Sequence, residues 1–497
     1  MTGGRPQTVL DDETDLNGPR VDVDRRVGWI LRMARTTTPG PDGAPLRLEA
    51  MAEAVGVSTT RLHRVETGVT RSGRVADAYE RVLGMPEGSL RAPVDIICRT
   101  FPYAQADREP GEPVTSTKEM SALTEALLGP DPTGGQWLRG ARALAQPGAI
   151  GLPEGLARDL VRRLADEMSR SVGHAYPSRY EAMALLRCSA YGHLVLEVAQ
   201  EIVGDPHVQV MYDLMSAVGE RPSPDALAWC LELLDHGRDR VVIGGALAIE
   251  AMAEVAEEGF WAPVVAPLVD RLDAGQEGTV RHDWLSHLLR LVPRPVVAGS
   301  GRRPAHPLAP VPVIPDWSRT RVNPHWSECQ ERAWAITEEL RLGPQPMLAR
   351  LLFDIAIGPF ESRAATSYFL LRGVPTIAAA VGAQLGELVD AHADPLVRER
   401  AGRRLVGTMD HHYHPLATRW IAAGTVEERD RGLRLAGSAG HLVPEEELRA
   451  GLTEAALYAA GMAGHPCLPA LAADPTLSER VRGAAAWWLR AGSRLQH

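Results

Sequence analysis

Cysteine is scarce and scattered in this sequence. The chain has five cysteines, no two of them form a C-x-x-C pair, and an odd number cannot all pair within one chain. A secreted disulfide scaffold is therefore excluded, since such proteins depend on many paired cysteines. We expect a protein of the reducing cytoplasm, with thiols at Cys98, Cys188, Cys230, Cys329 and Cys467.

Long apolar runs are also missing. No stretch approaches the roughly 18 consecutive apolar residues that span a bilayer. Residues 1–24 hold six acidic and two basic side chains, whereas a secretory signal needs a positive start followed by an apolar core. We therefore expect a cytoplasmic protein with no membrane partner.

Known catalytic and nucleotide-binding motifs are absent as well. The sequence has no G-x-x-x-x-G-K-[ST], G-x-G-x-x-G, G-x-S-x-G or H-E-x-x-H. The residues that could bind a metal or act as a nucleophile are most concentrated in two segments, 410–414 (DHHYH) and 465–467 (HPC). Adjacent histidines diverge around a turn instead of converging on a metal, and Cys467 has no orienting base at a suitable spacing. We predict no catalytic residue, no metal site and no cofactor, and hence a protein that is not an enzyme.

Positive charge depends on arginine, because Lys118 is the only lysine. The formal charge of the whole chain is −10, which argues against non-specific coating of nucleic acid. Residues 25–99 nevertheless hold twelve basic and eight acidic side chains. A basic N-terminal module followed by an acidic remainder is the distribution expected where one module alone contacts DNA.

Apolar periodicity predicts an all-α protein. Apolar residues recur at helical spacing almost throughout the chain, for example over 179–202 and 445–461. The one strand candidate, 311–314, is flanked by prolines, which weaken it. A chain of 497 residues is too long for one compact core, so we expect several helical domains.

Several predicted helices begin with the same dipeptide, Asp-Pro. Asp205-Pro206, Asp394-Pro395 and Asp474-Pro475 each fit a helix start, since the aspartate caps free amides and proline loses no hydrogen bond in the first turn. The V-R-x-x-A spacing that follows resembles HEAT-type repeats, which implies an α-solenoid. The spacing between phrases is irregular, so a non-repetitive helical domain remains the alternative.

The segment 46–68 (LRLEAMAEAVGVSTTRLHRVETG) carries the strongest local pattern. A first helical run ends at Gly56, which can adopt the positive φ of a sharp turn, and Ser58 can cap a second run by accepting from an amide near Arg61. Ala52 is small where the two helices must cross closely. This order of residues resembles the Cro and lambda-repressor type of helix-turn-helix, also called XRE-like.

The resemblance implies a DNA-binding surface at the start of the second helix, which lies in the major groove in that family. If Ser58 is the cap, the polar residues that follow it become candidates for the outward face of the helix. Threonine side chains there can contact thymine methyls or phosphate oxygens, and arginine side chains can contact phosphates or guanine edges. The predicted DNA-binding residues are Arg47, Ser58, Thr59, Thr60, Arg61, His63 and Arg64.

Other residues of the motif have structural roles. Glu66 is predicted to pair with an arginine such as Arg35, and apolar contacts between the helices are expected from Met51, Val55, Val57, Leu62 and Val65. One departure stands out: residues 36–45 form a Pro- and Gly-rich loop where the family has a short turn. No contact is therefore carried over to the first helix.

These patterns predict six consecutive segments. They are a disordered acidic tail (1–23), a helix-turn-helix domain (24–92), a linker (93–114), a helical and HEAT-like domain (115–298), a Pro-rich crossover or linker (299–324), and a second HEAT-like helical domain (325–497). The fold expected overall is a small DNA-binding domain followed by a large α-helical body.

The preferred functional hypothesis is a sequence-specific regulator of transcription that binds double-stranded operator DNA. Its body would mediate homodimerisation and sense a small-molecule or protein effector, because the DNA-binding domain needs only a small part of the chain. The alternative is an α-solenoid interaction scaffold with the helix-turn-helix as adaptor. A helical-repeat DNA repair enzyme is the third hypothesis.

Overall fold

The computed structural model describes residues 9–40, 43–101, 103, 115–256, 259–309, 324–408 and 414–496. Within these ranges the chain forms α-helices joined by turns and no β-strand, so the prediction of an all-α protein is confirmed. Among the described residues, no helix combines the length and the apolar character needed to cross a membrane.

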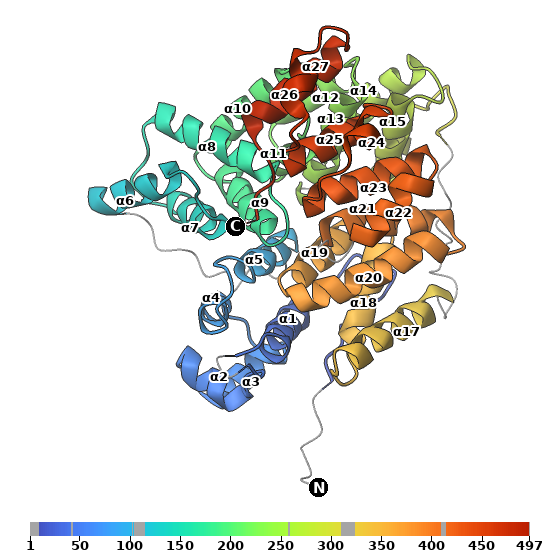
Figure 1. The fold of residues 1–497 in the computed structure, drawn as a ribbon. Helices are drawn as coiled ribbons and strands as arrows, with labels where there is room; N and C mark the ends of the chain where they lie inside the picture. The colour runs from blue at the N-terminus through green and yellow to red at the C-terminus, as the bar shows by residue number, and fades with distance from the viewer. Residues whose placement is uncertain are drawn as a thin grey trace.

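The first five helices form a small bundle at one end of the molecule. They are α1 (Val23–Thr37), α2 (Leu48–Val55), α3 (Thr59–Glu66), α4 (Gly73–Val82) and α5 (Arg91–Thr100). Helices α1 and α5 lie against the large helical body, and α2 and α3 lie on the far side of α1, at the end of the molecule (Figure 1).

The body begins with a series of stacked helices. These are α6 (Thr117–Leu128), α7 (Gly134–Leu144), α8 (Glu154–Met168), α9 (Ala175–Arg187), α10 (Gly192–Gly204), α11 (Tyr212–Gly219), α12 (Pro224–Leu233), α13 (Asp239–Val255), α14 (Ala262–Asp273), α15 (Val280–Leu291) and α16 (Arg294–Gly299). Alternate helices pack on one another, from α9 to α11, α13 and α15. Such packing buries the faces that a single helix pair would leave exposed.

A second series follows and stacks in the same way, from α19 to α21, α23, α25 and α27. Its helices are α17 (Pro324–Glu339), α18 (Pro346–Ala356), α19 (Glu361–Arg372), α20 (Pro375–Ala391), α21 (Pro395–Thr408), α22 (His414–Ala423), α23 (Val426–Ala439), α24 (Glu445–Arg449), α25 (Glu454–Ala463), α26 (Leu468–Ala473) and α27 (Glu479–Ala491).

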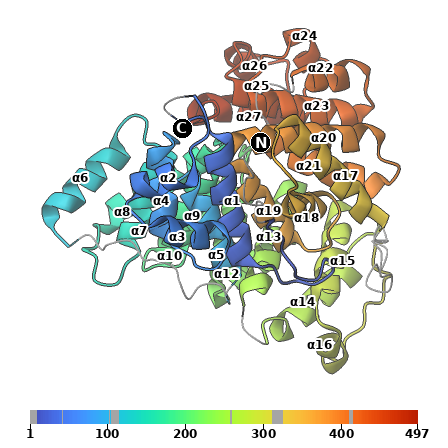
Figure 2. The ribbon, with the colours of Figure 1, turned by 90° about the horizontal axis from the view of Figure 1, so that it is seen from below.

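The end of the chain returns to the start of the body. The Val172 amide donates to the Leu495 carbonyl (2.9 Å), and the Leu495 amide donates to the Arg170 carbonyl (2.8 Å). An ion pair between Arg240 and Glu454 (2.8 Å) adds a second connection. The two helical series therefore close on each other, and α9 and α19 lie near the middle of the molecule (Figure 2). Side chains of α9, α19 and α25 line one cavity between the series.

The prediction of a disordered tail over 1–23 is wrong for the described residues of that segment. From residue 9 onward the chain runs along the body, with Leu10 5 % and Asp12 0 % exposed. Arg350 on α18 pairs with Asp11 (3.0 Å), and Arg363 on α19 donates to the carbonyls of Asp15 and Gly18 (2.8 and 2.6 Å). The acidic side chains that suggested a solvated tail are thus held by distant arginines.

The linker predicted over 93–114 is also wrong where the structure describes it. Residues up to Thr100 belong to α5, whose Ile96 and Ile97 are buried. Pro93 lies in the first turn of α5, where a missing amide breaks no helical hydrogen bond. Residues 104–114 lie outside the described residues.

Two of the long helical runs predicted from the sequence are interrupted in the structure. The run 179–202 is two helices, because a turn at 188–191 separates α9 from α10, and 445–461 is likewise divided into α24 and α25. The strand candidate 311–314 and the histidine cluster 410–413 lie outside the described residues. The described start of the Pro-rich segment packs on the body, where the Ala309 amide donates to the Ser286 hydroxyl (3.0 Å).

Candidate nucleic-acid interface

Helices α2 and α3 are joined by a tight turn at residues 56–58. Gly56 ends α2 with φ +77°, in the left-handed region that glycine adopts without strain. Ser58 begins α3, and its hydroxyl accepts from the Arg61 amide (3.2 Å), as the sequence predicted. Met51 and Leu62 are fully buried between the helices, so the turn holds α2 and α3 at one fixed angle.

The inner face of α3 is fastened by Glu66, which is 3 % exposed. The Arg35 guanidinium on α1 donates to both carboxylate oxygens of Glu66 (2.6 and 2.7 Å), which confirms the predicted pair. The Tyr79 hydroxyl on α4 adds a third hydrogen bond to it (2.6 Å). Burial and the neighbouring Glu66 charge raise the pKa of Tyr79, so its hydroxyl stays a donor. One carboxylate thus connects α1, α3 and α4.

Backbone contact between α1 and the end of α3 requires glycine on both sides. A Cβ on Gly28 would lie 2.6 Å from the Val65 carbonyl oxygen and 2.7 Å from the Gly68 amide nitrogen. Gly68 itself has φ +70°, and a Cβ there would lie 2.6 Å from the backbone of Arg25. The two helices therefore cross with no side chain between them at this point.

Replacing Gly28 by alanine should destabilise the protein by about 1–3 kcal/mol, because the added methyl forces a well-packed crossing apart. Urea denaturation followed by circular dichroism measures the change. Gly155 on α8 is the matched control: a Cβ there meets no atom within 4 Å, so Gly155→Ala should be neutral or stabilise by up to about 1 kcal/mol. Equal effects of the two substitutions would contradict the crossing described here.

The predicted DNA-binding residues are exposed or half-buried. Thr60, Arg61, His63 and Arg64 on α3 are exposed, and Thr59 is half-buried. Ser58 is exposed beside its cap hydrogen bond, and Arg47 is exposed at the start of α2. Among the described residues, the side chains of Arg47, Arg61 and Arg64 form no ion pair or hydrogen bond. Three exposed guanidinium groups are thus available for an external ligand.

Other arginines of residues 25–99 have internal partners. Arg71 pairs with Asp24 (2.5 Å), Arg91 pairs with Asp95 (2.9 Å), and Arg99 pairs with Glu181 on α9 (2.9 Å). Arg91 and Arg99 are 2 % and 8 % exposed. Part of the formal positive charge of this region is therefore neutralised by internal ion pairs. The exposed Arg47, Arg61 and Arg64 thus carry a larger share of its surface charge than the sequence suggested.

A buried ionic cluster joins this bundle to the body. Arg26 on α1 pairs with Asp12 (2.6 Å) and with Asp354 on α18 (2.8 Å), and Asp354 also pairs with Arg363 on α19 (2.8 Å). None of the four side chains is more than 1 % exposed. The Ser367 hydroxyl accepts from Arg26 (2.8 Å). The two positive and two negative charges balance. Their ion pairs join α1 of the bundle directly to α18 of the body.

The carboxyl of Asp12 gives this docking a pH dependence. Burial raises the pKa of Asp12, but the charge of Arg26 and hydrogen bonds from Thr14 outweigh it and lower the pKa from 3.8 to about 2. A lowered pKa stabilises the folded state fully above the unfolded value, and this contribution is lost as pH falls from 3.8 towards 2. Asp12→Asn should therefore cost about 2 kcal/mol at pH 7 and progressively less below pH 3.8.

Urea denaturation of the wild type and Asp12→Asn at pH 7 and at pH 3 measures this difference. A stability difference that stays constant between the two pH values would show that Asp12 is not held as a carboxylate by Arg26.

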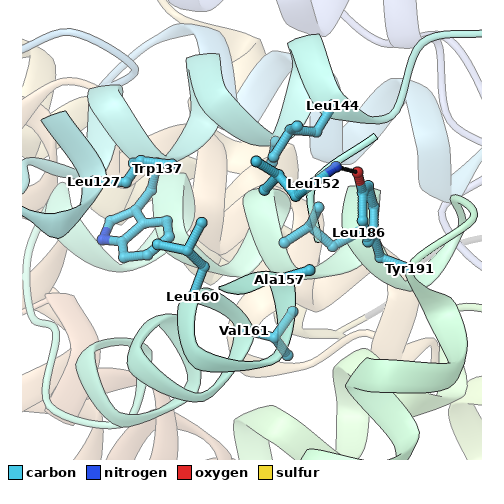
Figure 3. Close-up of a pocket in the computed structure, with 10 residues that line it drawn as sticks. Leu127, Trp137, Leu144, Leu152, Ala157, Leu160, Val161, Leu186 and Tyr191 are labelled. Carbon is cyan, nitrogen blue, oxygen red and sulfur yellow. Dashed lines mark hydrogen bonds between the residues drawn. The ribbon is translucent and has the colours of Figure 1, made fainter. Parts of the chain in front are cut away.

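An apolar cavity lies between α7, α8 and α9 (Figure 3). Leu144, Leu160 and Val161 line it, and a hydrogen bond at its edge joins the Leu152 amide to the Tyr191 hydroxyl (3.0 Å). Its accessible volume of about 10 Å³ is close to that of a single water. It is a packing gap in the core and has no room for an organic ligand.

His325, Glu328 and His392 are close enough together to suggest a metal site, which the sequence pattern did not. The Asp394 amide donates to Nδ1 of His392 (3.0 Å), so a neutral ring carries its proton on Nε2 and donates it to Glu328 (3.1 Å). Arg332 holds the other oxygen of Glu328 (3.0 Å). Nδ1 of His392 and both oxygens of Glu328 thus already have hydrogen-bond partners, and we interpret the group as a hydrogen-bond cluster.

His465 and Cys467 also have a structural role. The Cys467 amide donates to Nδ1 of His465 (3.1 Å), and the Cys467 thiol is buried at the start of α26. Burial raises its pKa, which makes the thiol a poorer nucleophile.

No protein-family model and no curated protein matches this chain. Sequence reasoning found the exposed residues of α3 and their cap, but it missed Gly28, Tyr79 and the cluster around Arg26. Gly28 and Tyr79 act through close contacts with other helices of the bundle, which no local pattern predicts.

Proposed function

We propose that this protein is a sequence-specific DNA-binding regulator of transcription, with α3 as the helix that enters the major groove. The observation that carries the proposal is the division of α3 into two faces. One face is fixed to α1 and α4 through Glu66, and the other presents Arg61 and Arg64 without internal partners. A rigid helix with free guanidinium groups is what base recognition requires, because each bidentate contact depends on orientation.

The start of α3 favours the same role. Its first amides and the exposed Thr60 hydroxyl can approach a phosphate, since a helix N-terminus attracts anions. Arg47, which is exposed before the first residue of α2, suits the phosphate backbone. The resemblance of residues 46–68 to Cro and lambda-repressor proteins supports this arrangement, in which the second helix of the motif contacts base edges.

We further propose that two copies act together in the cytoplasm on paired half-sites. A monomer presents a single short recognition helix of eight residues, which contacts few base pairs. Two-fold pairing would double the contacts and place the half-sites about 34–36 Å apart, or a multiple of that distance.

Selection from random duplex DNA at physiological salt tests the proposal. The full-length chain should enrich one motif with two related half-sites. Enrichment of no sequence would overturn the proposal, and recovery of a stoichiometric protein partner in the same preparation would then favour an interaction scaffold.

A further inference from the structure

A polar cavity of about 290 Å³ lies where the two helical series face each other. It is bounded by the turn before α9 and by α9, α11, α19, α21, α23 and α25. The side chains that give it its character are Ser171, Tyr176, Asp213, Arg372, Arg404 and Tyr458. Its volume is at the lower end of the range of ligand pockets, about 300–1,000 Å³, so it suits a small organic molecule.

Arg372 places a buried positive charge at this cavity. The side chain is 7 % exposed, and it donates to the Gly173 carbonyl (2.5 Å) and to the Tyr368 hydroxyl (3.3 Å). Its guanidinium lies over the rings of Tyr176 and Tyr368, 5.2 and 5.1 Å from their centres. Its buried Nε has no hydrogen-bond partner, and among the described residues no carboxylate forms an ion pair with Arg372. A buried charge without a counterion is costly, so an anion there is favoured.

The remaining polar groups do not supply that anion. The carboxyl of Asp213 accepts from the Tyr176 hydroxyl (2.5 Å) and, among the described residues, forms no ion pair with Arg372. Burial raises its pKa, and the charge of Arg372 acts in the opposite direction. Arg404 pairs with Glu361, and burial lowers its pKa to about 10, so it stays charged at neutral pH. Its guanidinium lies 5.7 Å from the centre of the Tyr368 ring. The cavity therefore holds more positive than negative charge, next to hydroxyl groups and aromatic faces.

We propose that this cavity is an effector site for a small organic anion that carries a carboxylate or a phosphate. The anion binds Arg372 through charge-assisted hydrogen bonds, and its apolar part packs between the aromatic rings that line the cavity. Tyr458 and Ser438, whose hydroxyls lie 3.0 Å apart, add further polar groups to the lining.

Helix α19 connects the cavity to the DNA-binding bundle. Ser367 and Arg363 on α19 hold Arg26 and the segment before α1, and Arg372 lies five residues beyond Ser367, about 8 Å along the helix axis. A ligand that shifts α19 would act directly on the docking of α1. This regulatory step rests on the proposed DNA-binding function, whereas ligand binding itself does not.

Isothermal titration calorimetry of the full chain without DNA tests the site, with benzoate and phenyl phosphate as probes and benzamide as the uncharged comparison. At least one anion should bind with one-to-one stoichiometry, and the stronger of the two identifies the preferred acid group. Arg372→Gln should weaken binding about tenfold or more, as the loss of a charged hydrogen-bond donor implies. Arg302→Gln, at an exposed position 54 % accessible, should leave binding unchanged.

Where circular dichroism shows that Arg372→Gln does not fold, Val210→Trp takes its place, because Val210 lines the cavity and a larger side chain there should also abolish binding. The site is overturned if neither anion binds, if benzamide binds equally well, or if the folded variants bind like the wild type. A DNA affinity that is unchanged at saturating probe overturns the regulatory step alone. Failure of all DNA binding overturns the proposed function and leaves the calorimetric result standing.

Discussion

Replacing Arg61 and Arg64 together by alanine should lower the affinity for the selected operator about 100-fold or more, since each bidentate base contact is worth about 1–3 kcal/mol. Both side chains are exposed and free of internal partners, so the fold should keep its stability to within about 0.5 kcal/mol. Fluorescence anisotropy with a labelled operator measures the affinity, and urea denaturation of the same preparation checks the fold.

The matched control for this double variant is Arg302→Ala with Arg490→Ala. These two arginines are also exposed but lie on the body, so their loss removes the same formal charge without touching α3. Operator affinity within about threefold of the wild type is expected for the control, because screened charges far from DNA contribute little. A double variant at Arg61 and Arg64 that binds like this control would exclude α3 as the recognition helix.

Replacing Arg26 by methionine should destabilise the protein by about 3–5 kcal/mol, because it removes one partner from a buried ionic cluster and leaves Asp12 without its counterion. Because methionine retains much of the volume of the arginine side chain, the loss of stability reflects the missing charge more than altered packing. Urea denaturation at neutral pH measures it. We also expect the first segment of the chain to become sensitive to protease, since Asp12 and its neighbours would no longer be held.

The neighbouring residue provides the control for this prediction. Arg25 pairs with Glu13, but the two side chains are 35 % and 76 % exposed, so Arg25→Met should cost no more than about 1 kcal/mol. If Arg26→Met costs no more than Arg25→Met, the cluster does not anchor α1 to the body.

The part of the interface that could be predicted from the sequence depends on local interactions. Gly56 and Ser58 act on the residues beside them, so the turn and the cap follow from residue type and spacing. Glu66 and Arg35 were predicted as partners because the motif leaves a buried carboxylate at that position. The periodicity of apolar residues gave the all-α fold for the same reason, since it reflects each helix separately.

The part that could not be predicted depends on distant residues. Asp12 and Arg26 are close in sequence, but Asp354 and Arg363 lie more than 300 residues further along, and no spacing rule links them. The acidic start therefore suggested disorder. Formal charge was misleading for a related reason, because Arg91 and Arg99 count as basic in the sequence and yet are buried with carboxylates.

The effector cavity is another feature that depends on residues distant in sequence. Its lining comes from six separate elements, and Tyr176, Arg372 and Tyr458 become neighbours only when the two helical series close on each other. In the sequence each of these residues is an ordinary member of an amphipathic helix. Function on the body was therefore expected from its size, but its location was not.

Recognition of bases by α3 is tested most directly by repeating the random-DNA selection with the single variants Arg61→Gln and Arg64→Gln. The account predicts that at least one variant selects a motif changed at one position of each half-site, with the other positions retained, because glutamine favours adenine where arginine favours guanine. Two variants that both select the wild-type motif with wild-type affinity would contradict the account.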